Sequence, residues 1–360
     1  MRFESLRIAG LRCLESVALK PAPGINVFVG PNGAGKTSVL EAAYLLSHGR
    51  SFRAGSRDVL LKRGASALSV FAEVAALDGS IRRLGLGRES GRWQARVDGD
   101  VAASLSSLVQ ECAVVCFEPG SHDLVAGASE ERRRYLDWGL FHVEHDFVGQ
   151  WRRYQRALKQ RNALLRRGGT PDVNLLTPWE AELSVAGEAI GRYRQNYLDA
   201  VLPHIRAFTD AVLPEMGEFS LKYRPGWDDS QSLADVLADR RDRDLSRGHT
   251  TVGPHRADFS LAFDQAPLRE HLSRGQEKLC ALACLLGQAS LYAETRGEWP
   301  VICLDDLASE LDRTHQEWVV NQLLGRDAQV FITGTDVPAA LADHPIIVFH
   351  VEQGQVAALL

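Results

Sequence analysis

The chain has 360 residues, which is enough for two folded units, and its 45% hydrophobic and 24% charged residues are typical of a soluble globular protein. No apolar run approaches the roughly 18 residues that a membrane-spanning helix needs. The N-terminal segment carries charges every few positions and lacks the apolar core of a signal peptide, so we expect a cytoplasmic protein. The net charge of -5 argues against a uniformly basic nucleic-acid-binding protein, but it is compatible with a local basic face.

The first third of the chain is expected to consist mainly of strands. Alternating hydrophobic residues predict strands at 2–9 and 17–19, and a short apolar run predicts a buried strand at 25–29. A helix is predicted over 37–46, ending at His48 and Gly49. Further strands are expected at 68–75, 81–86, 93–97 and 114–117.

The middle of the chain changes to long, charged segments that are compatible with helices. Apolar residues from Trp151 to Leu165 fall near one helical face. After the break at Gly168–Gly169, Thr177 is predicted as an N-cap with Pro178 at the first helical position. The helical region extends to about residue 245, with a polar and mobile stretch expected near 228–243. Alternating strand and helix patterns return from about residue 250.

This order predicts an α/β protein in which a helical lobe is inserted into a head domain. We expect mixed sheets around one central helix in the head. The expected lobe I comprises residues 1–120 and 248–360, and the expected lobe II comprises residues 121–247. The six cysteines include no CxxC pair and lack partners at metal-ligand spacing, so we interpret them as buried free thiols.

A phosphate-binding loop follows the predicted strand at 25–29 and opens the predicted helix. Its residues are Gly30, Pro31, Asn32, Gly33, Ala34, Gly35, Lys36 and Thr37, followed by Ser38. Glycines let backbone N–H groups converge on phosphates, and the helix N-terminus adds the positive end of its dipole. Lys36 is expected to reach the β- and γ-phosphates, and the hydroxyl of Thr37 is expected to ligate Mg²⁺. These features predict binding of a nucleoside triphosphate.

An acidic pair at the end of an apolar strand completes this prediction. The apolar run at 301–304 is followed by Asp305 and Asp306. We expect Asp305 to hold Mg²⁺ through water and Asp306 to orient or deprotonate the attacking water. Arg53, after the helix, is a candidate arginine finger for the γ-phosphate.

A second motif lies about 27 residues before the acidic strand. Ser273 is predicted as an N-cap and Gln276 as its capping-box partner, for a helix that continues through Leu286. A capped helix alone would account for these two residues. Gly275 adds a position where a backbone can approach a phosphate.

The segment from Leu272 to Lys278 resembles the LSGGQ signature of ABC-type ATPases, with Arg274 at its third position. The resemblance implies that Ser273 and the amides of Arg274, Gly275 and Gln276 contact the γ-phosphate of ATP bound by another subunit. It therefore implies an ATP-sandwich dimer, with Lys36, Asp306 and Ser273 as its catalytic residues.

Three further elements follow from the same resemblance. The segment ending at Asp312 resembles the loop that crosses such a dimer interface. Thr333 or Thr335 follows the strand after it, where a γ-phosphate sensor is expected. The usual Q-loop glutamine cannot be placed near residues 117–119.

Longer stretches resemble the RecF family of bacterial recombination-repair proteins, within the RecF and SMC group of chromosome-maintenance ATPases. They are residues 1–46, 123–137, 251–258 and 304–312, and with the signature they extend over almost the whole chain. The family resemblance implies a two-lobed ABC-type head that dimerises on gapped DNA with ATP and hydrolyses ATP slowly. It also implies action with RecO and RecR to load RecA.

The candidate DNA contacts lie in the predicted helical lobe. Between residues 151 and 167 there are seven basic residues and no acid, which favours contact with phosphates. The candidates are Arg152, Arg153, Arg156, Lys159 and Arg161, with Arg132 and Arg133 as a second cluster. One or more of the second cluster could instead anchor the lobe junction. Nothing predicts the reading of particular bases.

Two alternative functions share parts of this pattern. A transporter-type ATP-binding subunit would have the same loop and signature, but normally in a smaller chain without a basic helical insertion. An SMC-type chromosome-structure ATPase would show long heptads. An inactive scaffold is disfavoured because Lys36, Thr37, Asp305, Asp306 and Ser273 are all present.

Overall fold

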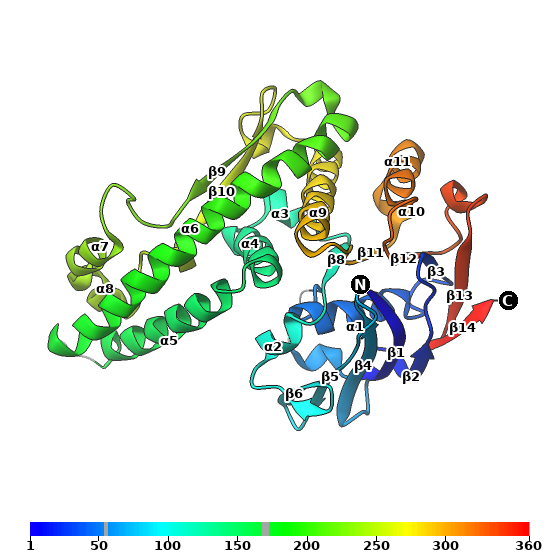
Figure 1. Ribbon diagram of the computed structural model, residues 1–360, viewed down its shortest axis with the longest axis horizontal. Helices are drawn as coiled ribbons and strands as arrows, with labels where there is room; N and C mark the ends of the chain where they lie inside the picture. Colours follow the sequence, from blue (N-terminus) through cyan, green and yellow to red (C-terminus); the bar gives the residue numbers. More distant parts are fainter. Residues whose placement is uncertain (54–56, 168–172, 360) are drawn as a thin grey trace. The chain divides into compact units, whose positions relative to one another are not determined.

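The computed structural model describes residues 1–53, 57–167 and 173–359, which fall into two compact units. Unit 1 comprises residues 1–122 and 274–360, and unit 2 comprises residues 123–273. The α/β class and the helical insertion predicted above are confirmed (Figure 1). The predicted break at Gly168–Gly169 lies outside the described residues.

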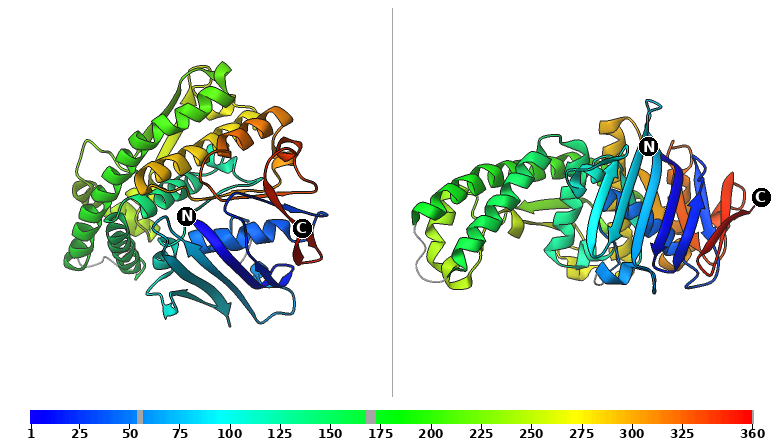
Figure 2. Two further views of the ribbon diagram at one scale, coloured as in Figure 1. Left: turned by 45° about the vertical axis from the view of Figure 1, so that its right-hand side comes forward. Right: turned by 90° about the horizontal axis from the view of Figure 1, so that it is seen from below.

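Unit 1 contains two six-stranded sheets (Figure 2). The first is antiparallel, with the order β2-β1-β4-β5-β6-β7, and the second has the order β14-β13-β3-β12-β11-β8. The strands are β1 Arg2–Leu11, β2 Leu14–Leu19, β3 Ile25–Val29, β4 Ala67–Ala75, β5 Ile81–Glu89, β6 Arg92–Val97, β7 Asp100–Val101, β8 Val114–Phe117, β11 Val301–Leu304, β12 Val330–Gly334, β13 Ile346–Glu352 and β14 Gln355–Leu359. The helices are α1 Lys36–His48, α2 Leu105–Val109, α9 Arg274–Arg296, α10 Leu307–Glu310 and α11 Arg313–Leu323.

The central strands of the second sheet are almost continuously apolar. Strands β8, β11, β12 and β3 are mutually parallel and buried along nearly their whole length. Parallel strands are covered on both faces, so they need apolar residues at every position rather than at alternate ones. This pattern explains why the short apolar runs at 25–29 and 114–117 predicted these strands correctly.

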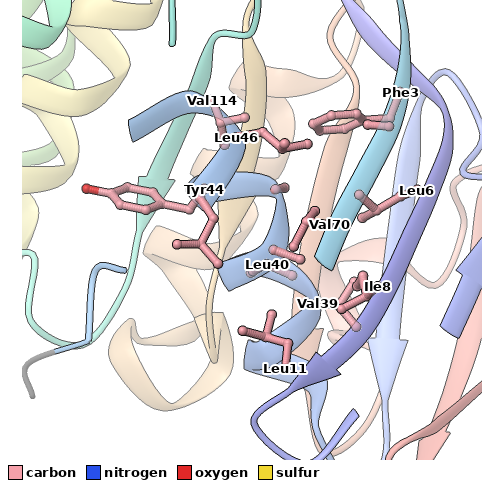
Figure 3. Close-up of a cluster of buried hydrophobic side chains, with 14 of the residues drawn as sticks. Phe3, Leu6, Ile8, Leu11, Val39, Leu40, Tyr44, Leu46, Val70 and Val114 are labelled. Atoms are coloured by element: carbon pink, nitrogen blue, oxygen red, sulfur yellow. The ribbon is translucent and has the colours of Figure 1, made fainter. Parts of the chain in front are cut away.

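Helix α1 packs against the antiparallel sheet. Figure 3 shows Val39 and Leu40 of α1 facing Ile8 of β1 and Val70 of β4, and all four side chains are buried. The helix ends at Gly49, whose φ of 64° is left-handed and whose N–H donates to the Leu45 carbonyl. This end confirms the predicted stop at His48 and Gly49.

Unit 2 is mainly helical. It contains α3 Asp123–Ala126, α4 Ser129–Val143, α5 Phe147–Leu165, α6 Val173–Val212, α7 Leu233–Asp239 and α8 Arg241–Arg247, with strands β9 Phe219–Arg224 and β10 Asp258–Phe263. Helices α5 and α6 run side by side (Figure 1). Strand β10 pairs with β9 rather than with either sheet of unit 1. For this reason unit 2 extends to Ser273, and the head resumes at Arg274 rather than at the expected residue 248.

Two predictions about local structure were wrong. Thr177 does not cap a helix: α6 begins at Val173, and the Thr177 hydroxyl donates to the Val173 carbonyl at 2.9 Å. Helices α7 and α8 overlap the stretch near 228–243, whose expected mobility stays a prediction. Five cysteines are buried free thiols, as predicted, but Cys13 is exposed.

Candidate nucleotide-binding site

The loop between β3 and α1 is folded around its own lysine. Lys36 opens α1 and is 8% exposed, and its ammonium donates to the carbonyls of Gly30 at 2.7 Å and Pro31 at 3.0 Å. The lysine charge is thereby held against the loop backbone, at the N-terminal end of the α1 dipole. Both features place positive potential where the predicted phosphates would lie.

The acidic pair lies at the end of β11, next to the neighbouring strand β12. The Thr333 hydroxyl donates to Asp305 Oδ1 at 2.7 Å and accepts the backbone N–H of Asp306 at 2.8 Å. Asp306 has a left-handed φ of 52° and stands at the start of α10. Thr333 thus fixes the side chain of one acid and the backbone of the next.

The electrostatics of Asp305 match an oxygen ligand for a cation. Burial raises the pKa of its carboxyl above the usual value, although hydrogen bonds with Thr333 and Thr37 and the charge of Arg53 act to lower the pKa. A buried carboxylate is costly to ionise unless a cation lies close to it. Carboxylate and hydroxyl oxygens suit Mg²⁺, so the Asp305 and Thr37 pair fits that ion.

A cavity of about 420 Å³ joins these groups. The predicted residues that line it are Asn32, Gly33, Gly35, Lys36, Thr37, Ser38, Arg53, Asp305, Asp306 and Thr333. The loop residues Gly30, Pro31 and Ala34 complete the loop backbone without lining the cavity. Thr335 lines a different cavity, so of the two threonines considered, Thr333 is the one placed beside the acids.

Five residues at this cavity were missed by the sequence analysis: Arg12, Cys13, Phe52, Glu118 and Pro119. Glu118 follows β8, whose end lies beside that of β11, because Phe117 pairs with Leu304. Glu118 and Pro119 therefore occupy the stretch in which no Q-loop glutamine could be placed. The position of Glu118 directly after a predicted strand was the signal that could have revealed it, because neighbouring parallel strands end at the same edge of a sheet.

Arg12 is held in place by a buried acid of α1. Its guanidinium donates to both carboxylate oxygens of Glu41, at 2.9 and 2.8 Å, and to the Val59 carbonyl at 3.1 Å. Glu41 also accepts a hydrogen bond from the Ser51 hydroxyl, and that hydroxyl accepts the N–H of Arg53 at 2.9 Å. One buried carboxylate thus links Arg12 to the segment that bears Arg53. An acid inside the mainly apolar stretch 39–46 of α1 was a signal for such a pair.

The signature residues occur at the start of α9, which begins at Arg274 directly after Ser273. Arg274, Gly275 and Gln276 do not line the cavity described above. The helix extends to Arg296, beyond the expected Leu286. Asp312 caps α11 by accepting the backbone N–H of His315 at 3.0 Å. Contact of these residues with a nucleotide on another subunit stays a prediction.

Two of the predicted DNA contacts are structural residues. Arg161 is fully buried and donates to Asp244 at 2.7 Å, while Arg132 is 5% exposed and bridges to Asp258 at 2.7 Å. Both guanidiniums are enclosed by carboxylates and carbonyls, so neither is available to a phosphate. The spacing of residues along the predicted helix could not reveal the partners of Arg161, because Glu180 and Asp244 lie on other elements.

The remaining basic residues of α5 lie on its surface. Arg152, Arg153, Arg156 and Lys159 are exposed. Arg153 pairs with Glu182 at 2.8 Å, and the Arg156 guanidinium lies 5.9 Å from the Trp179 ring. The segment 151–167 contains no acid, but Glu182 from α6 pairs with one of its arginines. The sequence of the segment alone therefore overestimates the positive charge of this surface. Arg133, on α4, is partly buried and donates to the Ala257 carbonyl at 2.7 Å.

Within the described residues, no helix is both long and apolar enough to cross a membrane.

The sequence resembles named proteins over its full length. The family model described as "RecF/RecN/SMC N terminal domain" matches residues 2–357. A protein of Stenotrophomonas maltophilia (strain R551-3), named "DNA replication and repair protein RecF", is 50% identical over 365 residues and both chains are fully covered. A protein of Xanthomonas oryzae pv. oryzae (strain MAFF 311018) with the same name is 50% identical over 363 residues, covering 99% of this chain and 100% of that one.

Solved structures show the same fold. A structure of the recombination mediator protein RecF with ATP, described as part of the RecFOR pathway, has a TM-score of 0.89 and 26% identity, with 99% of this chain and 97% of that chain covered. The Smc head domain of Pyrococcus furiosus has a TM-score of 0.57 at 14% identity, covering 99% of this chain and 96% of that one, and so shows the fold alone. The chain therefore belongs to the RecF/RecN/SMC N-terminal domain family and, within it, to the RecF proteins.

Proposed function

We propose that the chain is a DNA-binding ATPase of recombinational repair that dimerises when it binds ATP. The observation that carries this proposal is the convergence of Lys36, Thr37, Asp305 and Asp306 on one cavity, next to Thr333. The relatives named as DNA replication and repair proteins, and the RecF structure with ATP, support the choice of nucleotide and of process.

Each residue of the cavity would have its own role in binding and hydrolysis. Lys36 would leave the carbonyls of Gly30 and Pro31 to meet the β- and γ-phosphates. Thr37 and Asp305 would hold Mg²⁺, which when bound would neutralise phosphate charge. Asp306 would orient or deprotonate the attacking water, and its position depends on the hydrogen bond between its N–H and Thr333.

Arg53 is the candidate for the charge that develops in the transition state. It lines the cavity, and its charge acts to lower the pKa of Asp305, which places it in electrostatic reach of the acidic pair. An arginine close to a transferring phosphoryl group stabilises the charge on its oxygens.

The signature residues would complete the site of a second copy. Ser273, Arg274, Gly275 and Gln276 surround the start of α9, where the positive end of the helix dipole favours a phosphate. Asp312, at the start of α11, would lie at the same interface. Two identical sites in such a dimer would each need both copies.

DNA and the proteins of the pathway are the proposed partners. The exposed Arg152, Arg153, Arg156 and Lys159 of α5, with Arg133, would contact phosphates of gapped or duplex DNA without reading bases. The RecFOR pathway named for the RecF structures supports action with RecO and RecR, and through them with RecA. Hydrolysis would be slow and stimulated by DNA, so that ATP acts mainly to hold the dimer together.

Light scattering after size exclusion tests the dimer directly. The mass should double with MgATP and not with MgADP, and gapped or duplex DNA should favour the larger species. The same mass in every nucleotide state would contradict the sandwich model.

Two variants separate binding from dimerisation. Lys36→Ala should lose ATP binding, whereas Ser273→Ala should bind ATP and stay monomeric. The control is Ser220→Ala, which alters an exposed serine on β9 and should dimerise normally. Normal dimerisation of Ser273→Ala would remove the assignment of Ser273 to the second copy. Phosphate release with and without DNA then measures the proposed stimulation.

A further inference from the structure

The phosphate-binding loop is in contact with a hairpin that is distant in sequence. Strand β13 pairs in parallel with β3, the strand that leads into the loop, and His350 stands opposite Val29. Strand β14 then returns antiparallel to β13, with Gln353 and Gly354 at the turn between them. The turn therefore lies beyond the end of β3, beside the loop.

A backbone hydrogen bond joins the turn to the loop. The N–H of Gly354 donates to the carbonyl of Ala34 at 2.9 Å. Ala34 is central in the loop, between Gly33 and Gly35, which both line the cavity. The bond thus fixes the peptide group between Ala34 and Gly35, which lies in the stretch of loop whose N–H groups would face the phosphates.

Close packing holds the start of the loop against the same hairpin. Gly30 has a φ of 154°, and a Cβ built there would lie 2.0 Å from the Val351 carbonyl oxygen. Only a residue without a side chain fits between the loop and β13 at this point. The loop therefore meets the hairpin at Gly30 and again at Ala34.

The same turn also meets the turn between β1 and β2. Gly354 has a φ of 79°, and a Cβ on it would lie 2.4 Å from the carbonyl oxygen of Cys13. Cys13 and Arg12 line the nucleotide cavity. Gly354 is thus enclosed by backbone on two sides, and neither neighbour can move aside as a side-chain end could.

We propose that the β13–β14 turn is a positioning element of the nucleotide site, with Gly354 as its positioning residue. The turn holds the loop in the shape that directs its N–H groups at the phosphates, so a displaced turn costs nucleotide affinity. The inference rests on the proposed binding of ATP. Loss of a hydrogen bond between a loop N–H and a charged phosphate is expected to weaken binding by roughly ten- to a hundredfold.

The chain contains a matched control for this position. Ser90 and Gly91 join β5 to β6 with φ values of 49° and 78°, and Gln353 and Gly354 have 48° and 79°. A Cβ at Gly91, however, would meet nothing within 4 Å. Asparagine tolerates left-handed backbone better than other non-glycine residues, so Gly354→Asn and Gly91→Asn share one backbone requirement and differ in the clash.

The experiment compares both variants with the unaltered full chain by titration calorimetry with Mg²⁺ and ATPγS. Gly354→Asn should raise Kd roughly ten- to a hundredfold and keep its far-UV circular dichroism, whereas Gly91→Asn should bind as the unaltered chain does. Equal Kd values for the two variants would overturn the inference. Failure of the unaltered chain to bind would instead contradict the proposed function.

A measurement on the unaltered chain applies even if Gly354→Asn does not fold. Coupling between two sites is reciprocal, so a turn that positions the loop is itself stabilised when the loop binds its ligand. ATPγS should slow amide hydrogen exchange in a peptide spanning residues 350–358 and leave a peptide spanning residues 88–95 unchanged. Unchanged exchange in the first peptide, with ligand bound, would overturn the inference.

Discussion

The hydroxyl of Thr333 joins two consecutive acids of the site: it donates to Asp305 Oδ1 at 2.7 Å and accepts the N–H of Asp306 at 2.8 Å. Thr333 is 1% exposed, so these bonds have little competition from water. The arrangement makes Thr333 part of the acidic pair's geometry, in addition to any contact with a phosphate.

Thr333→Val should therefore impair hydrolysis more than it impairs ATP binding. Valine has nearly the same shape but leaves Asp305 and the Asp306 N–H without their partner, at a cost of about 1–3 kcal/mol in unfolding free energy. Phosphate release and ATP affinity are measured on the same preparation. Thr335→Val alters an exposed threonine outside the cavity and should leave both unchanged. An equal loss in the two variants would contradict the role given to Thr333.

Arg161→Ala should destabilise unit 2. Its guanidinium is fully buried and bonds Glu180, Asp244 and Thr250, which come from α6, α8 and the segment after α8. Removal of one partner from a buried ion network costs about 3–5 kcal/mol, because the remaining charges lose their compensation. Urea unfolding measures the loss. Wild-type stability of Arg161→Ala would show that the network contributes little.

The exposed cations of α5 should act on DNA binding rather than on stability. For each true phosphate contact among Arg152, Arg156 and Lys159, alanine should reduce the slope of log affinity against log salt by about 0.9 on duplex DNA. Fluorescence anisotropy at several salt concentrations measures the slope. Arg243→Ala, an exposed residue of α8, is the control. A slope that is unchanged in all three variants would remove α5 from the DNA-binding surface.

His255 should make the protein less stable as the pH falls from about 6.5 towards 4. Burial lowers the pKa of its imidazole from 6.5 to about 4, so the unfolded chain binds a proton in this range and the folded chain does not. Nε2 must donate to the Thr250 carbonyl at 3.0 Å, and Nδ1 then accepts from the Tyr154 hydroxyl at 2.6 Å. Protonation of Nδ1 would oppose that bond.

The pH dependence can be isolated with His255→Gln, which has no titratable group. The difference in unfolding free energy between the unaltered chain and this variant should shrink by up to about 3 kcal/mol between pH 7 and pH 4. Above pH 7 the difference should be constant. A difference independent of pH over the whole range would mean that His255 titrates normally in the folded chain.

The phosphate-binding loop and its strand could be predicted because their signal is local. Strand β3, helix α1 and the stop at Gly49 depend on residues close in sequence. Asp305 and Asp306 were found in the same way, as the end of an apolar run. For the threonine beside Asp305, the sequence left two candidates, Thr333 and Thr335. Only the pairing of β12 with β11 decides which of the two faces Asp305.

Features that depend on distant partners could not be predicted. Arg161 lies in a basic stretch without acids, and its partners Glu180 and Asp244 belong to other helices. Residues 258–263 have the pattern of a strand, which was assigned to the head, yet β10 pairs with β9 in unit 2. Thr177 and Pro178 form a capping pattern, yet both lie inside α6, where Pro178 removes one backbone hydrogen bond of the helix.

The sheet order also determines when the nucleotide site can form during synthesis. Strand β3 has β12 and β13 as its two neighbours, and both are made about 300 residues after it. At a ribosomal rate of about 5–20 residues per second, β3 waits roughly 15–60 s for either partner. An incomplete chain therefore carries the loop sequence without a sheet to hold it, and competence to bind nucleotide arises only once β12 and β13 have emerged and paired.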